Sequence, residues 1–462
     1  MNYEESVRTL LALGRELASP QHARVQKFGL ENITTLAAAL GNPHRAAPCV
    51  HIAGTNGKGS TAAMLESILR ASGLRTGLYT SPHLVRINER IRIGGKDISD
   101  EEFASAWTRV QATIESLLAE GKLAAHPTYF ECITALAFVA FAAREINFAV
   151  YETGLGGRLD ATNVVLPEVS IITSIDFDHE DYLGHSIEEI AGEKAGIIKP
   201  GIPVVTTAAR PEARAVIAQR AHETNSPLVE IDEAWRVEDV RSDGGCYGAV
   251  AISKDSGDKI TIAPPLPGRF QIRNALAAVT AARVLAERGF PITDEIIEHG
   301  IRSVRWPGRL ERLLDRPAVY VDGTHNPAGA RELLKFWDDN FAGRKIILVY
   351  AAMRDKAVDE IAGLLFPRAD LVLLTQPDQP RAISATLLSE MTSHLARRSE
   401  IVRDPVAALE QAIQLAGPGD AVFATGSLYL VGDLRAYWAK RSALPSVSGG
   451  AGKTTAPNPC AR

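Results

Sequence analysis

Short apolar runs alternate with amphipathic stretches along most of this chain. The run at residues 48–53 predicts a strand, and residues 61–72 repeat their apolar positions with helical spacing until Gly73 ends the pattern. Further apolar runs at residues 74–80, 147–151 and 169–173 predict strands of a sheet covered on both faces. Strands separated by helices in this order indicate an α/β fold with a mostly parallel sheet.

Three helices are predicted from their first turns, because Ser or Thr followed three residues later by Glu forms a capping box. The pairs are Ser99 with Glu102, Thr128 with Glu131, and Ser186 with Glu189.

Residues 234–265 differ in character: short alternating runs around two glycine-containing turns predict hairpins at an edge of the first domain. An Ala-rich helix is expected after them, at residues 274–288.

The pattern breaks at residues 303–309, and we place a domain boundary there, between a first domain at residues 1–303 and a second at 304–441. In the second domain, strands are expected at residues 319–322, 345–350, 371–375 and 421–425, which predicts a smaller, Rossmann-like α/β domain. It lacks Gly-x-Gly-x-x-Gly after its first strand, which argues against dinucleotide binding. Residues 442–462 are rich in Ser, Gly and Pro and are predicted to be a disordered tail. Gly452-Lys-Thr-Thr455 in this tail lacks a preceding strand, so we reject it as a phosphate site.

Composition narrows the functional classes. A chain of 462 residues, 46% hydrophobic and 23% charged, can form more than one globular core. The net charge of -5, without blocks of like charge, argues against general nucleic-acid binding. The four cysteines show no metal-type spacing, and Cys49 and Cys132 fall in apolar runs, as buried residues do. With no signal peptide and no membrane-length apolar run, we expect a cytoplasmic protein.

A glycine-rich segment after the first predicted strand points to phosphate binding. Gly54-Thr-Asn-Gly-Lys-Gly-Ser60 places three glycines and Lys58 between an apolar strand and an amphipathic helix. This arrangement aims backbone N–H groups, a helix N-terminus and an ammonium group at an anion. The spacing is shorter than in the common P-loop, and an ordinary glycine turn is the alternative.

Three more polar segments follow predicted strand ends, where open α/β sheets bind their ligands. Glu152 ends a strand, and a carboxylate beside phosphates suits Mg²⁺, although it can equally be a capping residue. Acids flank His179, but Mg²⁺ prefers oxygen ligands, and a solvated acidic loop fits as well. Asp322-Gly-Thr-His-Asn-Pro327 fits a turn and helix cap, or a pair of side chains that reach across an interdomain cleft.

Seven segments occur in one order between about residue 25 and about residue 435: Gly54-Thr-Asn-Gly-Lys-Gly-Ser60, Tyr79-Thr-Ser-Pro-His-Leu84, Thr128-Tyr-Phe-Glu131, Glu152-Thr-Gly-Leu-Gly-Gly-Arg-Leu-Asp-Ala-Thr-Asn163, Gly192-Glu-Lys-Ala-Gly-Ile197, Pro307-Gly-Arg309 and Asp322-Gly-Thr-His-Asn-Pro327. Together they resemble the folylpolyglutamate synthase/dihydrofolate synthase family (bacterial bifunctional type), within the wider Mur ligase group of ATP-dependent amide-forming enzymes. The resemblance implies a P-loop ATPase-like Mur ligase central domain followed by a C-terminal glutamate ligase domain.

The resemblance also implies roles for single residues. Those that match ATP-contacting residues of the family are Asn56, Gly57, Lys58, Gly59, Ser60, Asn274, Arg309 and Asp322. Those that match its magnesium ligands are Ser81, Glu152, His179 and Lys194, where the lysine is carbamylated and helps to hold a second Mg²⁺. A carbamate attracts the cation that an ammonium repels, whereas the bare sequence favours a solvated helix lysine at this position. The expected catalytic residues are Lys58, Lys194 and His325, the last matching a histidine near the phosphates.

Three segments match the family's contacts to a pterin-bearing substrate: Phe28-Gly29-Leu30, Thr128-Tyr129-Phe130 and Leu159-Asp160-Ala161. They matter most for substrate identity, because muramyl ligases share the ATP machinery but not these contacts. The implied reaction transfers the γ-phosphoryl group of ATP to a substrate carboxylate, and L-glutamate then attacks the acyl phosphate. The acceptor is dihydropteroate, a (poly)glutamylated folate, or both.

Two alternatives stay open at this point: a muramyl-type ligase of cell-wall precursors, and a nucleotide-binding regulator that has lost catalysis. ATP contacts on both domains lead us to expect that domain closure assembles the site. The expected partners are small molecules, with no nucleic acid and no membrane, and the protein is expected to be a monomer.

Overall fold

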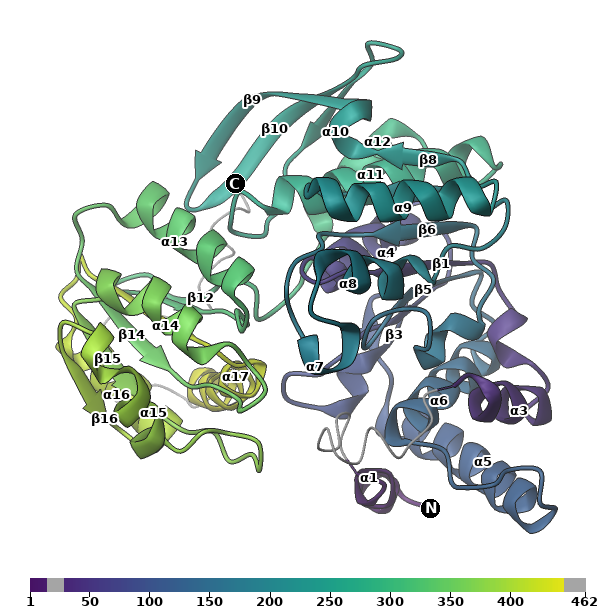
Figure 1. The fold of residues 1–462 in the computed structure, drawn as a ribbon, viewed down its shortest axis with the longest axis horizontal. Helices are drawn as coiled ribbons and strands as arrows, with labels where there is room; N and C mark the ends of the chain where they lie inside the picture. The colour runs from purple at the N-terminus through teal and green to yellow at the C-terminus, as the bar shows by residue number, and fades with distance from the viewer. Residues whose placement is uncertain (15–28, 444–462) are drawn as a thin grey trace.

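The computed structural model describes residues 1–14 and 29–443, which build two α/β bodies side by side (Figure 1). The N-terminal body contains an eight-stranded sheet that is parallel except at one edge, where the two outermost pairings are antiparallel. In pairing order its strands are β4 (Lys96–Asp97), β3 (Ile91–Ile93), β2 (Thr76–Tyr79), β5 (Phe148–Glu152), β1 (Cys49–Ala53), β6 (Val169–Ile172), β7 (Val204–Thr206) and β8 (Leu228–Glu230).

Helices cover both faces of this sheet. On β1, Val50 and Ile52 pack into one buried cluster, with α4 (Lys58–Ala71), α11 (Gln271–Glu287) and α12 (Asp294–Ser303). Cys49 points to the opposite face, into a second cluster with α1 (Tyr3–Ala12), α3 (Glu31–Ala39), α5 (Asp100–Ala119) and α6 (Tyr129–Ala143). Beside β6 and β7 lie α7 (Glu180–Leu183), α8 (Ile187–Ala195) and α9 (Pro211–Glu223). The short helix α10 (Ile231–Ala234) leads out of β8.

Strand register places the functional loops at one edge. Ile52 lies opposite Glu152 on β5, and Ala53 lies opposite Ile172 on β6. Because the three strands are parallel, their carboxyl ends are level, and the segments after them emerge together. The loop after β1 therefore starts between Glu152 and the residues that follow β6.

A three-stranded antiparallel sheet leaves the N-terminal body as a ribbon: β9 (Trp235–Asp243), β10 (Cys246–Ser253) and β11 (Lys259–Ile262). Figure 1 shows β9 and β10 reaching toward α13 (Pro327–Phe341) of the other body. The hydroxyl of Tyr247 donates to Oδ2 of Asp339 on α13 at 2.8 Å. The ribbon is thus a second connection between the bodies, beside the covalent linker.

The C-terminal body has a six-stranded sheet, parallel except for its first strand. In pairing order the strands are β12 (Glu311–Leu314), β13 (Ala318–Val321), β17 (Ala421–Thr425), β14 (Ile346–Tyr350), β15 (Leu371–Leu374) and β16 (Ser399–Ile401). The helices that cover it are α13, α14 (Val358–Leu365), α15 (Ala385–Thr392), α16 (Pro405–Leu415) and α17 (Leu428–Ala443). Single turns of 3₁₀ helix complete the chain at Pro43–Arg45 (η1), Ile87–Arg90 (η2), Ala161–Val164 (η3), Phe366–Arg368 (η4) and Ser393–Leu395 (η5).

The predicted α/β architecture is confirmed, and all three predicted capping boxes are present. Cys49 and Cys132 are free and buried, as predicted. Helix α4 begins at Lys58, earlier than the predicted residue 61, because Gly57 adopts a left-handed conformation and lets the helix start inside the loop. The tail was predicted to begin at residue 442, but α17 extends to Ala443, and residues 444–462 lie outside the described part. The domain boundary at residues 303 and 304 stays a prediction.

Candidate functional site

The loop between β1 and α4 is built around a glycine that no other residue can replace without strain. Gly57 has φ of 89°, and a Cβ there would lie 2.3 Å from Oδ1 of Asn274. Asn274 is buried on α11 and donates its amide to Gln271 at 2.9 Å. The bare glycine backbone thus lies directly against Asn274, so the structure brings together two segments that are far apart in sequence.

Two lysines converge on the backbone of this loop. Nζ of Lys58 donates to the carbonyl oxygens of Gly54 at 3.0 Å and Thr55 at 3.2 Å. Nζ of Lys194, from α8, donates to the same Gly54 oxygen at 2.9 Å. Burial, and next the charge of Lys58, lowers the pKa of Lys194 to about 7. The bare sequence favoured an ordinary solvated helix lysine at position 194. That interpretation is wrong, because the Lys194 side chain is buried at the site.

Glu152 lies at the carboxyl end of β5 and is 4% exposed. Its Oε2 accepts a hydrogen bond from the backbone N–H of Ser81 at 3.3 Å, which joins the segment after β2 to the site. Burial raises the pKa of Glu152 to about 7, although the charges of Lys58 and Arg309 oppose this shift. Because burial makes this carboxyl group costly to ionise, a cation bound beside it would strongly stabilise the ionised form.

His179 caps the short helix α7 in a left-handed backbone conformation, with φ of 54°. Such a conformation is unusual for a residue with a side chain and is often retained where it serves a site. Burial lowers the pKa of His179 to about 3, with the charge of Lys356 acting in the same direction and that of Asp178 against it. The ring is therefore neutral at physiological pH, the form in which imidazole binds metals.

The linker and the C-terminal body bring two predicted residues, Arg309 and Asp322, toward the loop. Asp322 is 5% exposed and accepts hydrogen bonds from the backbone N–H groups of Leu310 at 2.8 Å and Thr324 at 2.9 Å. Arg309 lies against this turn, since a Cβ on Gly323 would approach its Nη1 to 2.3 Å. The charge of Arg309 acts on the pKa values of both Lys58 and Glu152, which places the guanidinium near them. Asp322 therefore has the turn-forming role, one of the two roles that the sequence allowed, and it also orders the linker that carries Arg309.

His325 points at the N-terminal body. Its Nδ1 contacts the carbonyl oxygen of Gly323 at 2.8 Å, and its Nε2 lies 3.6 Å from Oδ2 of Asp178. The next residue, Asn326, exchanges two amide hydrogen bonds with Asn56, at 2.9 and 3.1 Å. The two domains are thus in direct contact at the P-loop.

Sequence analysis missed the acidic residue at the centre of this contact. Asp178 accepts from Nδ2 of Asn326 at 3.2 Å and pairs with Nζ of Lys356 at 2.7 Å. Burial alone would raise the pKa of Asp178, but His325 and the charge of Lys356 hold it well below its usual range. Asp178 stood in the acidic segment around His179, whereas nothing in the local sequence marks Lys356.

The four predicted metal ligands fit a divalent cation only if Ser81 and Lys194 take part in binding it. Within residues 1–14 and 29–443, no three His, Cys, Asp or Glu side chains form a ready metal cluster. Ser81, Glu152, His179 and Lys194 supply one hydroxyl, one carboxylate, one neutral imidazole and one buried amine. The set thus depends on Ser81 and on the chemistry of Lys194, whose pKa of about 7 leaves a share of neutral amine to react with CO₂.

Two of the three predicted substrate segments approach the loop that follows Glu152, through Phe130 and Asp160. Thr128 caps α6, Tyr129 is buried with the guanidinium of Arg90 5.7 Å from its ring centroid, and Phe130 packs against Gly154. Leu30 is the N-cap residue of α3 and Gly29 precedes it, whereas Phe28 lies outside the described residues. Leu159 is half-buried and Ala161 buried.

Asp160 is fully engaged by its own loop. Its Oδ2 accepts from the backbone N–H groups of Gly154 at 2.8 Å and Leu155 at 3.0 Å. Its Oδ1 accepts from the N–H and the hydroxyl of Thr162. Nε2 of the buried His51 lies 2.7 Å from that hydroxyl oxygen. Asp160 therefore shapes the loop after β5 from within.

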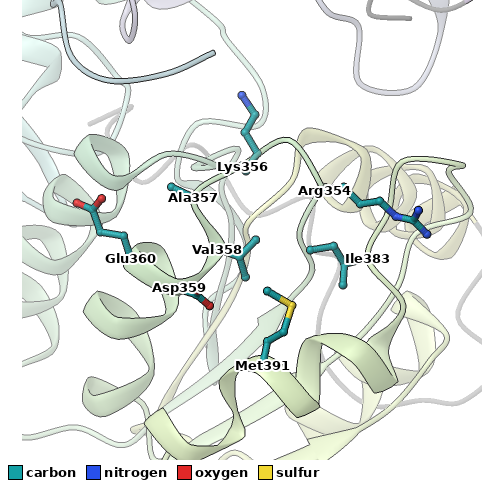
Figure 2. Close-up of a pocket in the computed structure, with 8 residues that line it drawn as sticks. All are labelled: Arg354, Lys356, Ala357, Val358, Asp359, Glu360, Ile383 and Met391. Carbon is teal, nitrogen blue, oxygen red and sulfur yellow. The ribbon is translucent and has the colours of Figure 1, made fainter. Parts of the chain in front are cut away.

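A cavity of about 340 Å³ opens in the C-terminal body (Figure 2). Its lining residues are Arg354, Lys356, Ala357, Val358, Asp359, Glu360, Ile383 and Met391. Figure 2 shows the side chain of Lys356 directed away from Val358, Ile383 and Met391. One residue thus borders this cavity and reaches Asp178 in the other body.

Comparison with known proteins agrees with this arrangement. The chain matches the Mur ligase middle domain over residues 52–282 and the Mur ligase glutamate ligase domain over residues 308–428. It is 38% identical to the dihydrofolate synthase/folylpolyglutamate synthase of Bacillus subtilis, covering 90% of this chain and 96% of that protein. It is 36% identical to the folylpolyglutamate synthase of Lacticaseibacillus casei, covering 94% of this chain and 98% of that protein.

Solved structures show the same likeness. The Mycobacterium tuberculosis folylpolyglutamate synthase complexed with ADP and AMPPCP superposes with a TM-score of 0.83 at 32% identity, over 94% of this chain and 99% of that one. Escherichia coli FolC in complex with DHPP and ADP superposes with a TM-score of 0.83 at 28% identity, over 96% of this chain and 99% of that one. This chain belongs to the dihydrofolate synthase/folylpolyglutamate synthase family of Mur ligases.

Proposed function

We propose that this protein is an ATP-dependent carboxylate–amine ligase that adds L-glutamate to dihydropteroate, to (poly)glutamylated folates, or to both. The observation that carries the proposal is the convergence of Lys58, Lys194 and the interdomain contact on one glycine loop. The relatives named above point to folate substrates and away from cell-wall precursors. The intact set of charged side chains argues against a regulator without catalysis.

ATP is proposed to bind at residues 56–60, with its phosphates on the backbone N–H groups at the start of α4. A helix N-terminus and a lysine together form a favourable anion site. Asn274 borders the same loop, and Arg309 and Asp322 approach from the linker and the C-terminal body. Support comes from the relatives solved with ADP and AMPPCP.

Magnesium is proposed to bind at Ser81, Glu152, His179 and a carbamylated Lys194, in two sites. When bound, it would neutralise charge on the transferring phosphoryl group. The raised pKa of Glu152 and the lowered pKa of Lys194, each to about 7, support this choice. Ionising Glu152 and carbamylating Lys194 would each place a negative charge at the site, and both charges would stabilise a bound cation.

The pterin-bearing substrate is proposed to bind beside Thr128, Tyr129 and Phe130, between α6 and the loop that Asp160 shapes. Residues 28–30 and 159–161 complete the proposed contacts. Support comes from the E. coli relative solved with DHPP and ADP.

L-Glutamate is proposed to occupy the cavity of the C-terminal body. Arg354 supplies positive charge for its carboxylates, and Ile383 and Met391 supply apolar surface for its methylene groups. Lys356 borders the cavity, with its ammonium group on Asp178, which lies at the contact between the domains.

The chemistry then needs positioning and charge neutralisation more than covalent participation. The substrate carboxylate attacks the γ-phosphorus of ATP, and ADP leaves while Lys58 and Arg309 neutralise the developing charge. The uncharged amine of L-glutamate then attacks the carbonyl carbon of the acyl phosphate. Inorganic phosphate leaves, the amine loses a proton and the amide forms. His325, near the phosphates, is the proposed third catalytic residue.

One experiment separates the candidate substrates. ADP release and product mass are measured with dihydropteroate, with a reduced folate and with a nucleotide-linked muramyl peptide, each with its amino acid. Glutamylated product from either pterin substrate supports the proposal. Turnover only with the muramyl peptide, or slow hydrolysis that no substrate accelerates, refutes it.

The working state is proposed to be a cytoplasmic monomer. Within residues 1–14 and 29–443, no helix combines the length and the apolar character needed to cross a membrane. Light scattering during gel filtration measures the mass in solution, and cell fractionation measures the location.

A further inference from the structure

Lys356 contacts the proposed metal ligand His179 from the opposite domain. Its Nζ lies 3.1 Å from Nε2 of His179 and 2.7 Å from Oδ1 of Asp178. The Lys356 side chain is 8% exposed and that of Asp178 10%, so the ion pair is shielded from solvent. An ammonium group therefore lies where a cation bound by Nε2 of His179 would be placed.

We propose that Lys356 is a resident cation that holds the two domains together at Asp178 and His179, and that it must leave before His179 can bind a metal ion. The proposal rests on the assignment of His179 as a metal ligand. Lys356 and Asp178 are positioning residues in this scheme, because each acts through His179 or through the domain contact.

The hydrogen-bonding capacity of the two side chains supports this exclusion. A lysine ammonium has three donors and no acceptor, so Nε2 of His179 must be the acceptor and Nδ1 must carry the proton. Among the described residues, Nδ1 is buried without a hydrogen-bond partner. Metal on Nε2 would take the lone pair that Lys356 uses. Metal on Nδ1 would move the proton to Nε2, which could then no longer accept from Lys356. Either mode of metal binding breaks the contact.

Asp178 makes the contact a latch between domains. Besides Lys356, it binds Asn326 at 3.2 Å, and His325 lies 3.6 Å away, so all three partners come from the C-terminal body. Asn326 in turn holds Asn56 of the P-loop. When the ammonium leaves, one of the three partners of Asp178 is lost, and the cavity bordered by Lys356 gains a free positive charge. Metal occupancy at one domain is thereby coupled to the state of the other.

The test measures metal affinity without nucleotide or catalysis. Free Mn²⁺ is followed by electron paramagnetic resonance during titration of the full-length, metal-stripped protein. Lys356→Met and Lys356→Gln should bind Mn²⁺ about tenfold more tightly than the wild type, as expected if the latch is closed in about nine molecules of ten. Lys356→Arg, which keeps a donor-only cation, should stay close to the wild type. Lys335→Met is the matched control, because Lys335 is an exposed lysine that pairs with Glu332 on α13.

Failure of the latch and failure of the metal assignment give different results. If His179→Asn weakens Mn²⁺ binding but both uncharged Lys356 variants bind like the wild type or more weakly, the latch is wrong and the metal ligand stands. If His179→Asn leaves binding unchanged, the metal assignment is wrong and the latch with it. Thermal unfolding of each variant shows whether it is folded. Two uncharged variants, Lys356→Met and Lys356→Gln, are used so that the test can still be made if one of them does not fold.

Small-angle scattering separates a latch from simple charge repulsion. Mn²⁺ should change the scattering profile of the wild type, and Lys356→Met should show the changed profile before metal is added. Tighter binding by Lys356→Met with a profile that stays identical to the wild type would mean that the ammonium only repels the metal, and would overturn the domain coupling.

Discussion

Lys58 and Lys194 donate hydrogen bonds to the same carbonyl oxygen, that of Gly54, from two different helices. Two ammonium groups held at one carbonyl oxygen repel each other, so protonating both lysines costs more free energy than protonating one of them. Burial first, and then this cost, lower the pKa of Lys194 to about 7. Burial also lowers the pKa of Lys58, but there the charges of Glu152 and Asp178 oppose the shift. We therefore expect separate chemistry, with Lys58 acting as the ammonium and Lys194 reacting as an amine.

Lys58→Ala should lower the rate of ADP release by about 10²–10³ fold, the usual effect of removing one preorganised charge from a reacting group. The fold should survive, because α4 keeps its buried face. ADP release is measured with saturating substrates, with Lys335→Ala as a control for the loss of any lysine. Near-normal ADP release by Lys58→Ala would rule out the ATP site proposed here.

Lys194 should carry a carbamate when bicarbonate is present. Labelling with ¹³C-bicarbonate should give a carbamate carbonyl resonance in the wild type and none in Lys194→Met. The resonance should strengthen as pH rises through about 7, because the pKa of Lys194 lies there and only the neutral amine attacks CO₂. A wild-type spectrum without this signal at any pH would leave the second metal site without a ligand.

Asp160→Asn should weaken the pterin site and leave the ATP site intact. Asparagine has one carbonyl oxygen where Asp160 uses two, so its amide group would face N–H or O–H donors. We expect a loss of about 1–3 kcal/mol in the free energy of unfolding. KM should rise for the pterin substrate and stay constant for ATP. An equal rise in both KM values would contradict the assignment, and Asp255→Asn, in an exposed turn, serves as control.

His51 should make stability fall as pH falls. Its Nε2 faces the Thr162 hydroxyl, and Nδ1 has no hydrogen-bond partner within the described residues. Burial, and next the charge of Lys199, lowers the pKa of His51 to about 3, whereas the unfolded chain titrates near its usual value of about 6.5. The unfolded state therefore binds the proton first. The stabilisation is complete above about pH 6.5 and is lost at about 1.4 kcal/mol per pH unit below it.

Thermal unfolding between pH 7 and pH 5 measures this slope. His51→Gln should flatten it, because the glutamine amide can still donate to Thr162 but does not titrate. Part of the slope should remain in the variant, since burial also lowers the pKa of His44, to about 4, and that of His179, to about 3. Parallel curves for wild type and variant would show that His51 does not titrate as described.

Local signals predicted much of the fold because they depend on neighbouring residues. The capping box at Thr128 and the glycines of the P-loop act within a few residues, and both were readable. Strands β7 and β8 were missed because three residues are too few to show a period. The early start of α4 was hidden because glycine has low helix propensity and gives no helical signal.

Only part of the candidate site could be predicted from the sequence, and the reason differs from that for the fold. Glu152 is the last residue of β5 and His179 lies beyond the end of β6, where the parallel sheet makes polar residues informative. Asp178 and Lys356 are 178 positions apart and meet only because two independent domains pack together. No local pattern encodes such a contact, and the burial that lowers the pKa of Lys194 is equally a property of the assembled fold.

The antiparallel ribbon gives the pair of domains a pivot. Tyr247 binds Asp339 at one point, and the linker at Gly308 joins the bodies at another, where its carbonyl oxygen accepts from Gly323 at 3.1 Å. Once the contacts at Asn56 and Asp178 have opened, these two attachments would let the C-terminal body rotate about the line between them but not slide freely along its neighbour. We expect substrate binding to swing the C-terminal body about this axis. The P-loop contact would then travel furthest, while the ribbon end of α13 stays nearly still.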